Sequence, residues 1–333
     1  MRTVFGHLPR ASLALLPTPL ERGPLLASGQ RLWVKRDDLT GLGMGGNKVR
    51  KLEFLCGDAV AIGARSLVTV GAAQSNHCRL TAAAGAVLGM EVHLVLSGER
   101  PDVPAGNQLL SALFGAQLHY TGAHESHWGE LMIAADSLAD ALGADGAAPY
   151  SIPIGGSTAT GALGYAAAFV ELMEQCAVVG IEPAAIVHTS SSGGTHAGLV
   201  AGRALWRSLG HHVPEVLAIG VAKGVNAGTP DIVELAGDVL ELLGHPAGLV
   251  SGSDVQLDPD WLGDDYAVPT AAGDDAMRWA ATTGGWVLDR TYTGKGLAGL
   301  RANAADGRWP RGADVIFVHT GGMPAVFAPG GAP

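Results

Sequence analysis

The sequence predicts an α/β fold in which mostly parallel sheets are covered by helices. Three observations lead to this prediction. Short apolar runs alternate along the chain with segments of helical periodicity, which is the pattern of βαβ units. Hydrophobic residues make up 47% of the chain and charged residues only 16%, so apolar surface for a large core is plentiful. The length of 333 residues suggests about two domains.

The first half of the chain contains several such units. Alternating apolar and charged residues predict a short strand at 31–35, and a glycine-rich loop follows at 41–46. Apolar residues at helical spacing predict a helix over 48–64, closed by Gly63. Further along, the sequence predicts strands at 66–70, 91–96, 117–120 and 148–154, and helices at 77–88 and 128–142.

The second half repeats the alternation. A long helix is expected over 161–174, a strand at 185–188 and another helix after Thr195. Buried strands are expected at 216–221, 286–288 and 315–318. The turn formed by Gly155 and Gly156 before the long helix is the best position for a crossing between two α/β lobes.

Charge and cysteine content exclude several classes of protein. Lys and Arg number 21 against 31 Asp and Glu, which gives a net charge of −10, and no basic cluster is long enough to follow a nucleic-acid backbone. The apolar run at 13–16 is too short for an export signal, and no stretch of 18 uncharged apolar residues is free of Gly or Pro breaks, so we expect neither export nor a membrane span. The three cysteines are widely spaced, which favours reduced thiols and a cytoplasmic location.

Paired glycines mark the loops in which ligands are expected to bind. Of the 49 glycines, the pairs beginning at residues 45, 155, 193 and 321 each follow a strand or open a helix. In the segment 187–198, three serines, Gly193, Gly194 and Thr195 precede a helix, which is typical of a phosphate site. The alternative is a turn that only caps the helix. The spacing matches neither of the common nucleotide-binding glycine motifs.

Lysine chemistry has few candidates in this chain. The five lysines are Lys35, Lys48, Lys51, Lys223 and Lys295. Lys48 stands in the first turn of a helix, directly after a glycine loop. The positive end of the helix and the neighbouring Arg50 and Lys51 favour its neutral amine, which Schiff-base chemistry requires. The alternative is an ordinary solvated lysine.

Other polar residues follow predicted strands. Ser75, Asn76 and His77 supply a hydroxyl, an amide and an imidazole at a helix start, or they form an ordinary helix cap. Strand ends are also expected at Tyr292 and Thr293, and at Thr320 before two glycines, while Tyr266 lies in a turn. The twelve histidines lack the spacing of a metal site, so we expect no bound metal.

Together these motifs resemble the fold type II pyridoxal-phosphate enzymes, in the group of D-cysteine desulfhydrase and 1-aminocyclopropane-1-carboxylate deaminase. The resemblance covers nearly the whole chain. It implies a small lobe at 52–162, a large lobe formed by 1–51 plus 163–333, and a homodimer. The matching motifs are LPTPL at 16–20, KRDD at 35–38, GGNK at 45–48, QSNH at 74–77, IGGS at 154–157, GTHAG at 194–198, YTGK at 292–295 and HTGG at 319–322.

The resemblance also implies roles for individual residues. Lys48 matches the lysine that binds pyridoxal phosphate covalently, and Asn76 matches the partner of its phenolic oxygen. The phosphate is expected at Ser192, Gly193, Gly194 and Thr195. The substrate carboxylate is expected at Ser75, Asn76 and His77, with Tyr266 and Tyr292 facing the substrate. Thr320, with Thr293 nearby, is expected to face the pyridine nitrogen. Lys48, Ser75, Tyr266 and Tyr292 are therefore the expected catalytic residues.

The implied activity is β-elimination from D-cysteine, which yields pyruvate, sulfide and ammonia. The aminocyclopropane deaminases carry Glu where this chain has Thr293, which favours the desulfhydrase. A hydroxyl beside the ring nitrogen also makes a weaker electron sink, which suits β-elimination. Two related activities stay open, namely L-cysteate sulfo-lyase and aminocyclopropane deaminase. A non-catalytic amino-acid binding protein is the alternative of another class, but it predicts loss of the lysine or of the glycine loop.

Overall fold

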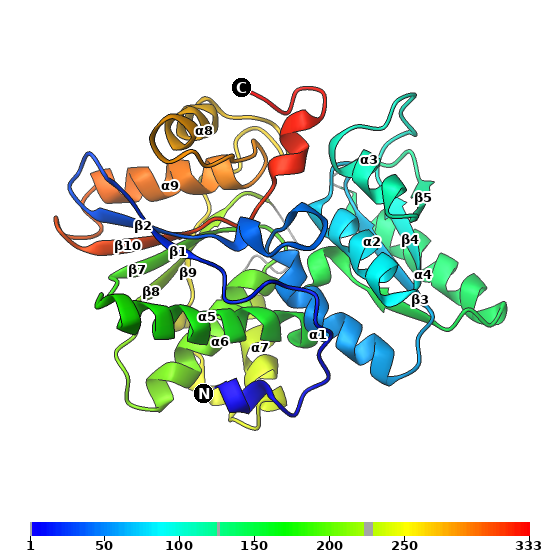
Figure 1. Ribbon diagram of the computed structural model, residues 1–333, viewed down its shortest axis with the longest axis horizontal. Helices are drawn as coiled ribbons and strands as arrows, with labels where there is room; N and C mark the ends of the chain where they lie inside the picture. The colour runs from blue at the N-terminus through cyan, green and yellow to red at the C-terminus, as the bar shows by residue number, and fades with distance from the viewer. Residues whose placement is uncertain (1, 125–126, 223–228) are drawn as a thin grey trace.

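The computed structural model describes residues 2–124, 127–222 and 229–333. Two separate sheets form two α/β lobes, which lie side by side in Figure 1. The helix α1, Lys48–Ala61, lies between them, since it packs on helices of both lobes. Of the five lysines, Lys223 falls outside the described residues.

The smaller sheet has the strand order β5-β4-β3-β6, and all its strand pairs are parallel. Its strands are β3 (Ser66–Gly71), β4 (Glu91–Leu96), β5 (Gln117–Tyr120) and β6 (Pro149–Ile152). The helices α2 (Asn76–Leu88), α3 (Gly106–Leu113) and α4 (Trp128–Ala144) connect them. Every residue of β3 is buried, as expected for a central strand with helices on both faces.

The larger sheet has the order β1-β2-β10-β7-β8-β9 and is parallel except for the edge pair β1 and β2. Figure 1 shows α5, α6 and α7 on one face and α8 and α9 on the other. The bounds are β1 Leu20–Leu25, β2 Arg31–Lys35, β7 Ala185–Ser190, β8 Glu215–Gly220, β9 Gln256–Asp258, β10 Asp314–Val318, α5 Ala159–Val179, α6 Gly194–Ser208, α7 Thr229–Leu242, α8 Ala271–Gly284 and α9 Thr293–Ala305.

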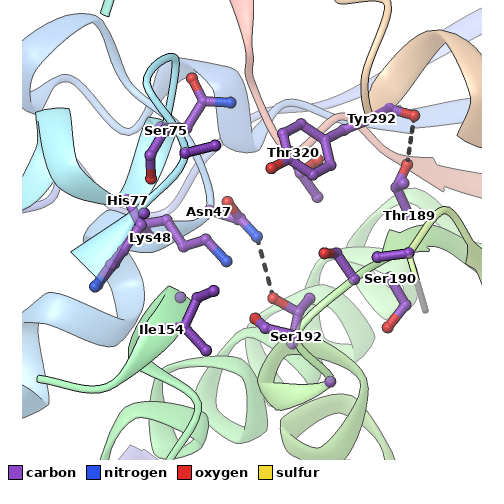
Figure 2. Close-up of a pocket in the computed structure, with 18 of the residues that line it drawn as sticks. Asn47, Lys48, Ser75, His77, Ile154, Thr189, Ser190, Ser192, Tyr292 and Thr320 are labelled. Carbon is purple, nitrogen blue, oxygen red and sulfur yellow. Dashed lines mark hydrogen bonds between the residues drawn. The ribbon is translucent and has the colours of Figure 1, made fainter. Parts of the chain in front are cut away.

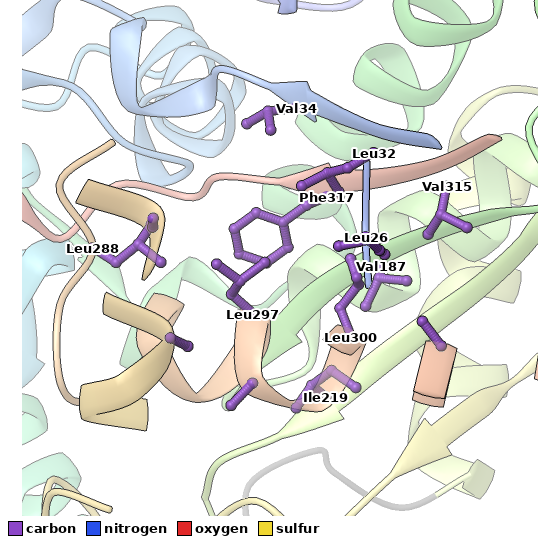
Figure 3. Close-up of a cluster of buried hydrophobic side chains, with 14 of the residues drawn as sticks. Leu26, Leu32, Val34, Val187, Ile219, Leu288, Leu297, Leu300, Val315 and Phe317 are labelled. Carbon is purple, nitrogen blue, oxygen red and sulfur yellow. The ribbon is translucent and has the colours of Figure 1, made fainter. Parts of the chain in front are cut away.

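One part of the core of the larger lobe lies between this sheet and α8 and α9, and another lies on the opposite face of the sheet, against α5 and α6. Phe317 on β10 and Leu297 and Leu300 on α9 are at most 1% exposed and pack together (Figure 3). Burial of each such side chain contributes about 1.5–3 kcal/mol. The long helix α5 has the length and composition of a membrane span, but 67% of its apolar window is buried inside the protein.

The predicted strand at 286–288 is wrong. Trp286 and Leu288 are buried in the core of the larger lobe and Val287 is exposed, so the alternation is present, but the segment pairs with no strand among the described residues. β10 already has β2 and β7 as neighbours. The prediction that Tyr292 and Thr293 lie at a strand end is therefore also wrong. Tyr292 is the N-cap of α9 and Thr293 is its first residue.

Candidate active site

A cleft opens between the two lobes, and its empty space, open solvent included, is about 830 Å³. Its walls come from the carboxyl ends of β3 and β7 and from the N-terminal turns of α1, α2, α4 and α6. Most of the residues predicted for the site line it: Lys48, Ser75, Asn76, His77, Ser192, Gly193, Thr195, Tyr266, Tyr292 and Thr320. Gly194 and Thr293 lie outside this lining.

Lys48 is the first residue of α1 and reaches toward the middle of the cleft (Figure 2). Burial lowers the pKa of its amine to about 8. Gly155 lies opposite the amine on the other wall of the cleft. A Cβ on Gly155 would stand 3.4 Å from Lys48 Nζ and would collide with Ser192. The backbone there has a φ of +64°, which also favours glycine.

The segment that follows β7 has the form of an anion site. The first backbone N–H groups of α6, which begins at Gly194, have no partner inside the helix and point into the loop. Two hydrogen bonds hold the hydroxyls of this loop. Ser157 Oγ donates to Ser192 Oγ at 2.8 Å. Asn47 Nδ2 donates to Thr195 Oγ1 at 3.1 Å, and a dashed line from Asn47 marks this bond in Figure 2. Gly193, with a φ of +80°, makes the turn into the helix.

Lys51 is a cation that the sequence reasoning did not place in the site. Its Nζ donates to Gly155 O at 3.0 Å and to Ser157 Oγ at 3.4 Å. A Cβ on Gly194 would stand 2.7 Å from the same Nζ, so the amine lies against the start of α6. Burial and the charge of Lys48 hold the pKa of Lys51 well below its ordinary value. A bound anion in this loop would stabilise the ammonium form.

The loop before α2 presents donors to the cleft. Ser75 Oγ accepts the N–H of Cys78 as the helix N-cap, which leaves its own hydroxyl proton for a ligand. Asn76 Oδ1 accepts from Asn107 Nδ2 at 3.0 Å. The amide nitrogen of Asn76 is therefore the part of that side chain suited to donate to an oxygen of a bound molecule.

Hydrogen bonding fixes the tautomer of His77. Thr69 Oγ1 donates to Ile152 O at 2.7 Å, so it accepts from His77 Nε2 at 3.0 Å. The proton is thus on Nε2, and Nδ1 is a buried acceptor without a partner among the described residues. Burial and the nearby Lys48 and Lys51 hold the pKa of the imidazole well below its usual value. The neutral ring cannot donate from Nδ1 to a carboxylate, whereas the backbone N–H of His77 in the first turn of α2 can.

Two tyrosines and a tryptophan meet on the other side of the cleft. The hydroxyls of Tyr266 and Tyr292 are hydrogen-bonded to each other. Trp128, the first residue of α4, contacts Tyr266 edge to face with ring centroids 5.2 Å apart. Trp128 belongs to the smaller lobe and the tyrosines to the larger, so these rings join the two walls.

Thr320 lies on the cleft wall, but Thr293 does not. The Thr293 hydroxyl donates to Asp289 Oδ1 at 2.6 Å and accepts from the Asp289 N–H at 2.8 Å. Asp289 itself lines the cleft, and its carboxylate also accepts the N–H groups of Tyr292 and Thr293 at 2.9 and 3.0 Å. Thr293 therefore stands behind Asp289, a residue that the sequence reasoning missed.

The residues present fit pyridoxal phosphate. One cleft brings together three features that this cofactor needs. They are a buried lysine with a pKa of about 8, a loop of hydroxyls and helix N–H groups for a phosphate, and glycines at positions where a Cβ would fill the space. Among the described residues, no group of three His, Cys, Asp or Glu side chains is arranged to hold a metal ion.

Comparison with known proteins agrees with this fit. The family model "Pyridoxal-phosphate dependent enzyme" matches residues 11–321. The chain is 40% identical to D-cysteine desulfhydrases of Salmonella choleraesuis and Salmonella typhi, over 97% of this chain and 96% of each relative. A crystal structure of an ACC deaminase homologue is 35% identical, with a TM-score of 0.86 over 98% of this chain and 95% of that one.

A crystal structure of a fungal L-serine ammonia-lyase from Rhizomucor miehei shares the fold at 20% identity, with a TM-score of 0.65 over 93% of this chain and 95% of that one. The match of the family model over most of the chain shows that this protein belongs to the pyridoxal-phosphate dependent enzyme family.

Proposed function

We propose that this pyridoxal-phosphate dependent lyase acts on D-cysteine, with water, to give pyruvate, hydrogen sulfide and ammonia. The observation that carries the proposal is the position of Lys48. Its buried amine lies in one cleft between the anion loop that follows β7 and the hydrogen-bond donors of the loop before α2. The 40% identity to D-cysteine desulfhydrases supports the choice of substrate.

In this proposal Lys48 binds the cofactor, which supplies an electron sink for the carbanion when it is bound. Ser192, Gly193, Gly194 and Thr195 hold its phosphate, with Lys51 as the counter-charge. The amide of Asn76 donates to its phenolic oxygen. Thr320 faces its ring nitrogen, since the Thr293 hydroxyl is already engaged by Asp289.

The substrate side uses the chain's own donors and bases. The Ser75 hydroxyl and the first N–H groups of α2 bind the substrate carboxylate, with the His77 contribution made by its backbone. The Lys48 amine or the hydrogen-bonded pair of Tyr266 and Tyr292 takes the Cα proton. The C–S bond then breaks, and sulfide leaves with the electron pair and is protonated.

The charges of the cleft favour a thiol over a sulfonate. Among the described residues that line the cleft, Lys48 and Asp289 are the ones whose side chains carry charge. A cysteate sulfonate would need a further cation or a cluster of N–H groups beside the leaving group. Aminocyclopropane deamination remains the second candidate, because a homologue of that enzyme has a similar structure. A non-catalytic binding protein is disfavoured, since Lys48 and the glycine loops are intact.

A substrate panel tests the proposal. The purified holoenzyme is given D-cysteine, L-cysteine, L-cysteate and aminocyclopropane carboxylate, and pyruvate, 2-oxobutyrate, sulfide and sulfite are measured. We expect equimolar sulfide and pyruvate from D-cysteine, and none from Lys48→Ala. Lys295→Met, which changes a buried lysine outside the cleft, serves as the control. Turnover of the cyclopropane substrate alone would overturn the proposal.

We also propose the lobe boundaries 52–162 for the small lobe and 1–51 plus 163–333 for the large one, a homodimer, and a cytoplasmic location without nucleic-acid or membrane partners. The free, buried state of all three cysteines supports a reducing compartment. Exposed apolar side chains on α3 and on the C-terminal turn that packs against it, such as Leu113 and Phe327, each 70% exposed, support an interface between two copies.

A further inference from the structure

One side of the cleft is closed by the three rings of Trp128, Tyr266 and Tyr292, which we call the aromatic wall. The Tyr266 ring contacts Trp128 at 5.2 Å and Tyr292 at 6.2 Å between centroids, both edge to face. This geometry is the preferred one for aromatic pairs. The wall is continuous across the boundary between the lobes.

Packing fixes the Trp128 ring in place. It lies against the buried cluster formed by Val68 and Val70 of β3, Val95 of β4 and Leu131 of α4. Withdrawal of the ring from the cleft would break these contacts as well as the contact with Tyr266. Trp128 therefore sets a firm limit on the space beside the tyrosine pair.

The wall is made of three aromatic rings, and the two tyrosine hydroxyls, which are hydrogen-bonded to each other, are polar groups within it. Asp289, the carboxylate among the described lining residues, is held by the N–H groups of Tyr292 and Thr293. Sulfur makes favourable contacts with aromatic rings, about 0.3–1.5 kcal/mol each. Such a wall of aromatic rings suits a small, neutral sulfur substituent.

From this geometry we propose that Trp128 is a specificity-determining residue that limits the β-substituent of the substrate to the size of a thiol. The proposal rests on the proposed lyase function. It concerns a residue that no motif singled out, because a lone tryptophan at the start of a helix carries no signal of a site. Removal of the indole should admit bulkier β-substituents, such as S-alkyl groups, at the expense of D-cysteine.

The test compares kcat/KM for D-cysteine and S-methyl-D-cysteine, both scored by pyruvate release. We expect Trp128→Ala to shift the ratio about tenfold or more toward the S-methyl substrate, since one methylene group is worth about 10–200-fold in a tight pocket. Trp128→Leu, which keeps apolar packing on β3, should shift the kcat/KM ratio in the same direction. This variant tests the proposal if the alanine variant does not fold. Trp128→Phe should stay near wild type.

Trp279→Ala is the matched control. That tryptophan is also half-buried, lies on α8 with the Arg301 guanidinium 5.0 Å from its ring, and is outside the cleft lining. The kcat/KM ratio of the Trp279→Ala variant for the two substrates should equal that of the wild type. A ratio unchanged within about twofold in both Trp128→Ala and Trp128→Leu, with cofactor bound, would overturn the proposal.

A binding measurement separates this proposal from the proposed function. D-alanine and D-norvaline lack a leaving group, and their dissociation constants can be read from the change in cofactor absorbance. Trp128→Ala should favour D-norvaline over D-alanine by about tenfold relative to wild type. Absence of sulfide release from D-cysteine by the wild type would refute the lyase proposal, while an unchanged binding ratio would refute the role of Trp128.

Discussion

At the scale of single residues, the site depends on two lysines one helical turn apart, Lys48 and Lys51. Both amines are buried, and burial lowers the pKa of each. They differ in surroundings: Lys48 Nζ faces Gly155 across the open cleft, whereas Lys51 Nζ donates to Gly155 O and Ser157 Oγ beneath the anion loop. The sequence predicted the role of Lys48 from its position at the start of a helix after a glycine loop. The role of Lys51 depends on contacts with residues about a hundred positions away along the chain.

The pKa of Lys48 predicts a pH dependence for cofactor attachment. The neutral amine is the reactive form, and its pKa of about 8 lies below the usual 10.5. In apoprotein, the rate of attachment of limiting pyridoxal phosphate should rise about tenfold per unit below pH 8 and level off above it. Stopped-flow absorbance measures this rate. A rate that keeps rising to pH 10 would show an ordinary lysine.

Lys51→Met should weaken cofactor binding. A hydrogen bond to a charged group contributes about 1.5–3 kcal/mol, so the dissociation constant should rise about 10–150-fold. Equilibrium dialysis of the apoprotein with pyridoxal phosphate measures it. Lys295→Met removes another buried amine, whose Nζ donates to Leu262 O away from the cleft, and should leave the constant unchanged. Equal effects of the two variants would contradict the phosphate role of Lys51.

At the scale of elements, a buried ion cluster fixes the helix that carries Lys48. Arg50 of α1 donates to Asp37 at 2.8 Å and to Glu171 of α5 at 2.8 Å, and Lys35 of β2 donates to Glu171 at 2.5 Å. The four charges sum to zero. The cluster joins β2, α1 and α5, so the first turn of α1 is held relative to the larger sheet.

Glu171→Gln should destabilise the protein by about 3–5 kcal/mol, because it leaves a buried cation without its partner. Urea unfolding at pH 7 measures the change. Asp275→Asn, which breaks an exposed pair with Arg301, should cost at most about 1 kcal/mol. A comparable loss in both variants would contradict the role of burial.

The same ion cluster predicts that the protein loses stability at acidic pH. Arg50 helps to lower the pKa of Asp37 to about 2 from the ordinary 3.8. The stability that ionised Asp37 provides is fully present above about pH 4 and is lost as the pH falls toward 2. Urea unfolding of the wild type between pH 5 and 3 should show the decline, and Asp37→Asn should flatten it. An equal decline in that variant would exclude Asp37 as its source.

Helix α9 shows why some elements escaped prediction. Its sequence holds three glycines in the first seven residues, which disfavours a helix on propensity. The fold requires them: a Cβ on Gly299 would stand 2.8 Å from the Ile219 side chain, and one on Gly296 would collide with Thr189. Close packing on the sheet thus overrides local preference. The strands β3 and β4, by contrast, are short segments rich in Val and Leu and were predicted almost to the residue.

At the scale of the whole molecule, the strands of the smaller sheet fall between β2 and β7 of the larger sheet along the chain, and the cleft lies between the two lobes. Motifs predicted most of its lining, since they carry glycines and hydroxyls at strand ends. They did not predict Trp128 or Asp289, whose positions follow from how α4 and α9 pack rather than from local patterns. The central claim is that Lys48 is the residue in this cleft that binds pyridoxal phosphate.

Borohydride reduction of the purified holoprotein, followed by peptide mass mapping, tests that claim most directly, because reduction fixes the cofactor to the lysine that holds it. We predict that the pyridoxyl group is found on Lys48, and that Lys48→Ala carries none. A pyridoxyl group on Lys35, Lys51, Lys223 or Lys295 in the wild type, or on none of the lysines, would contradict the account.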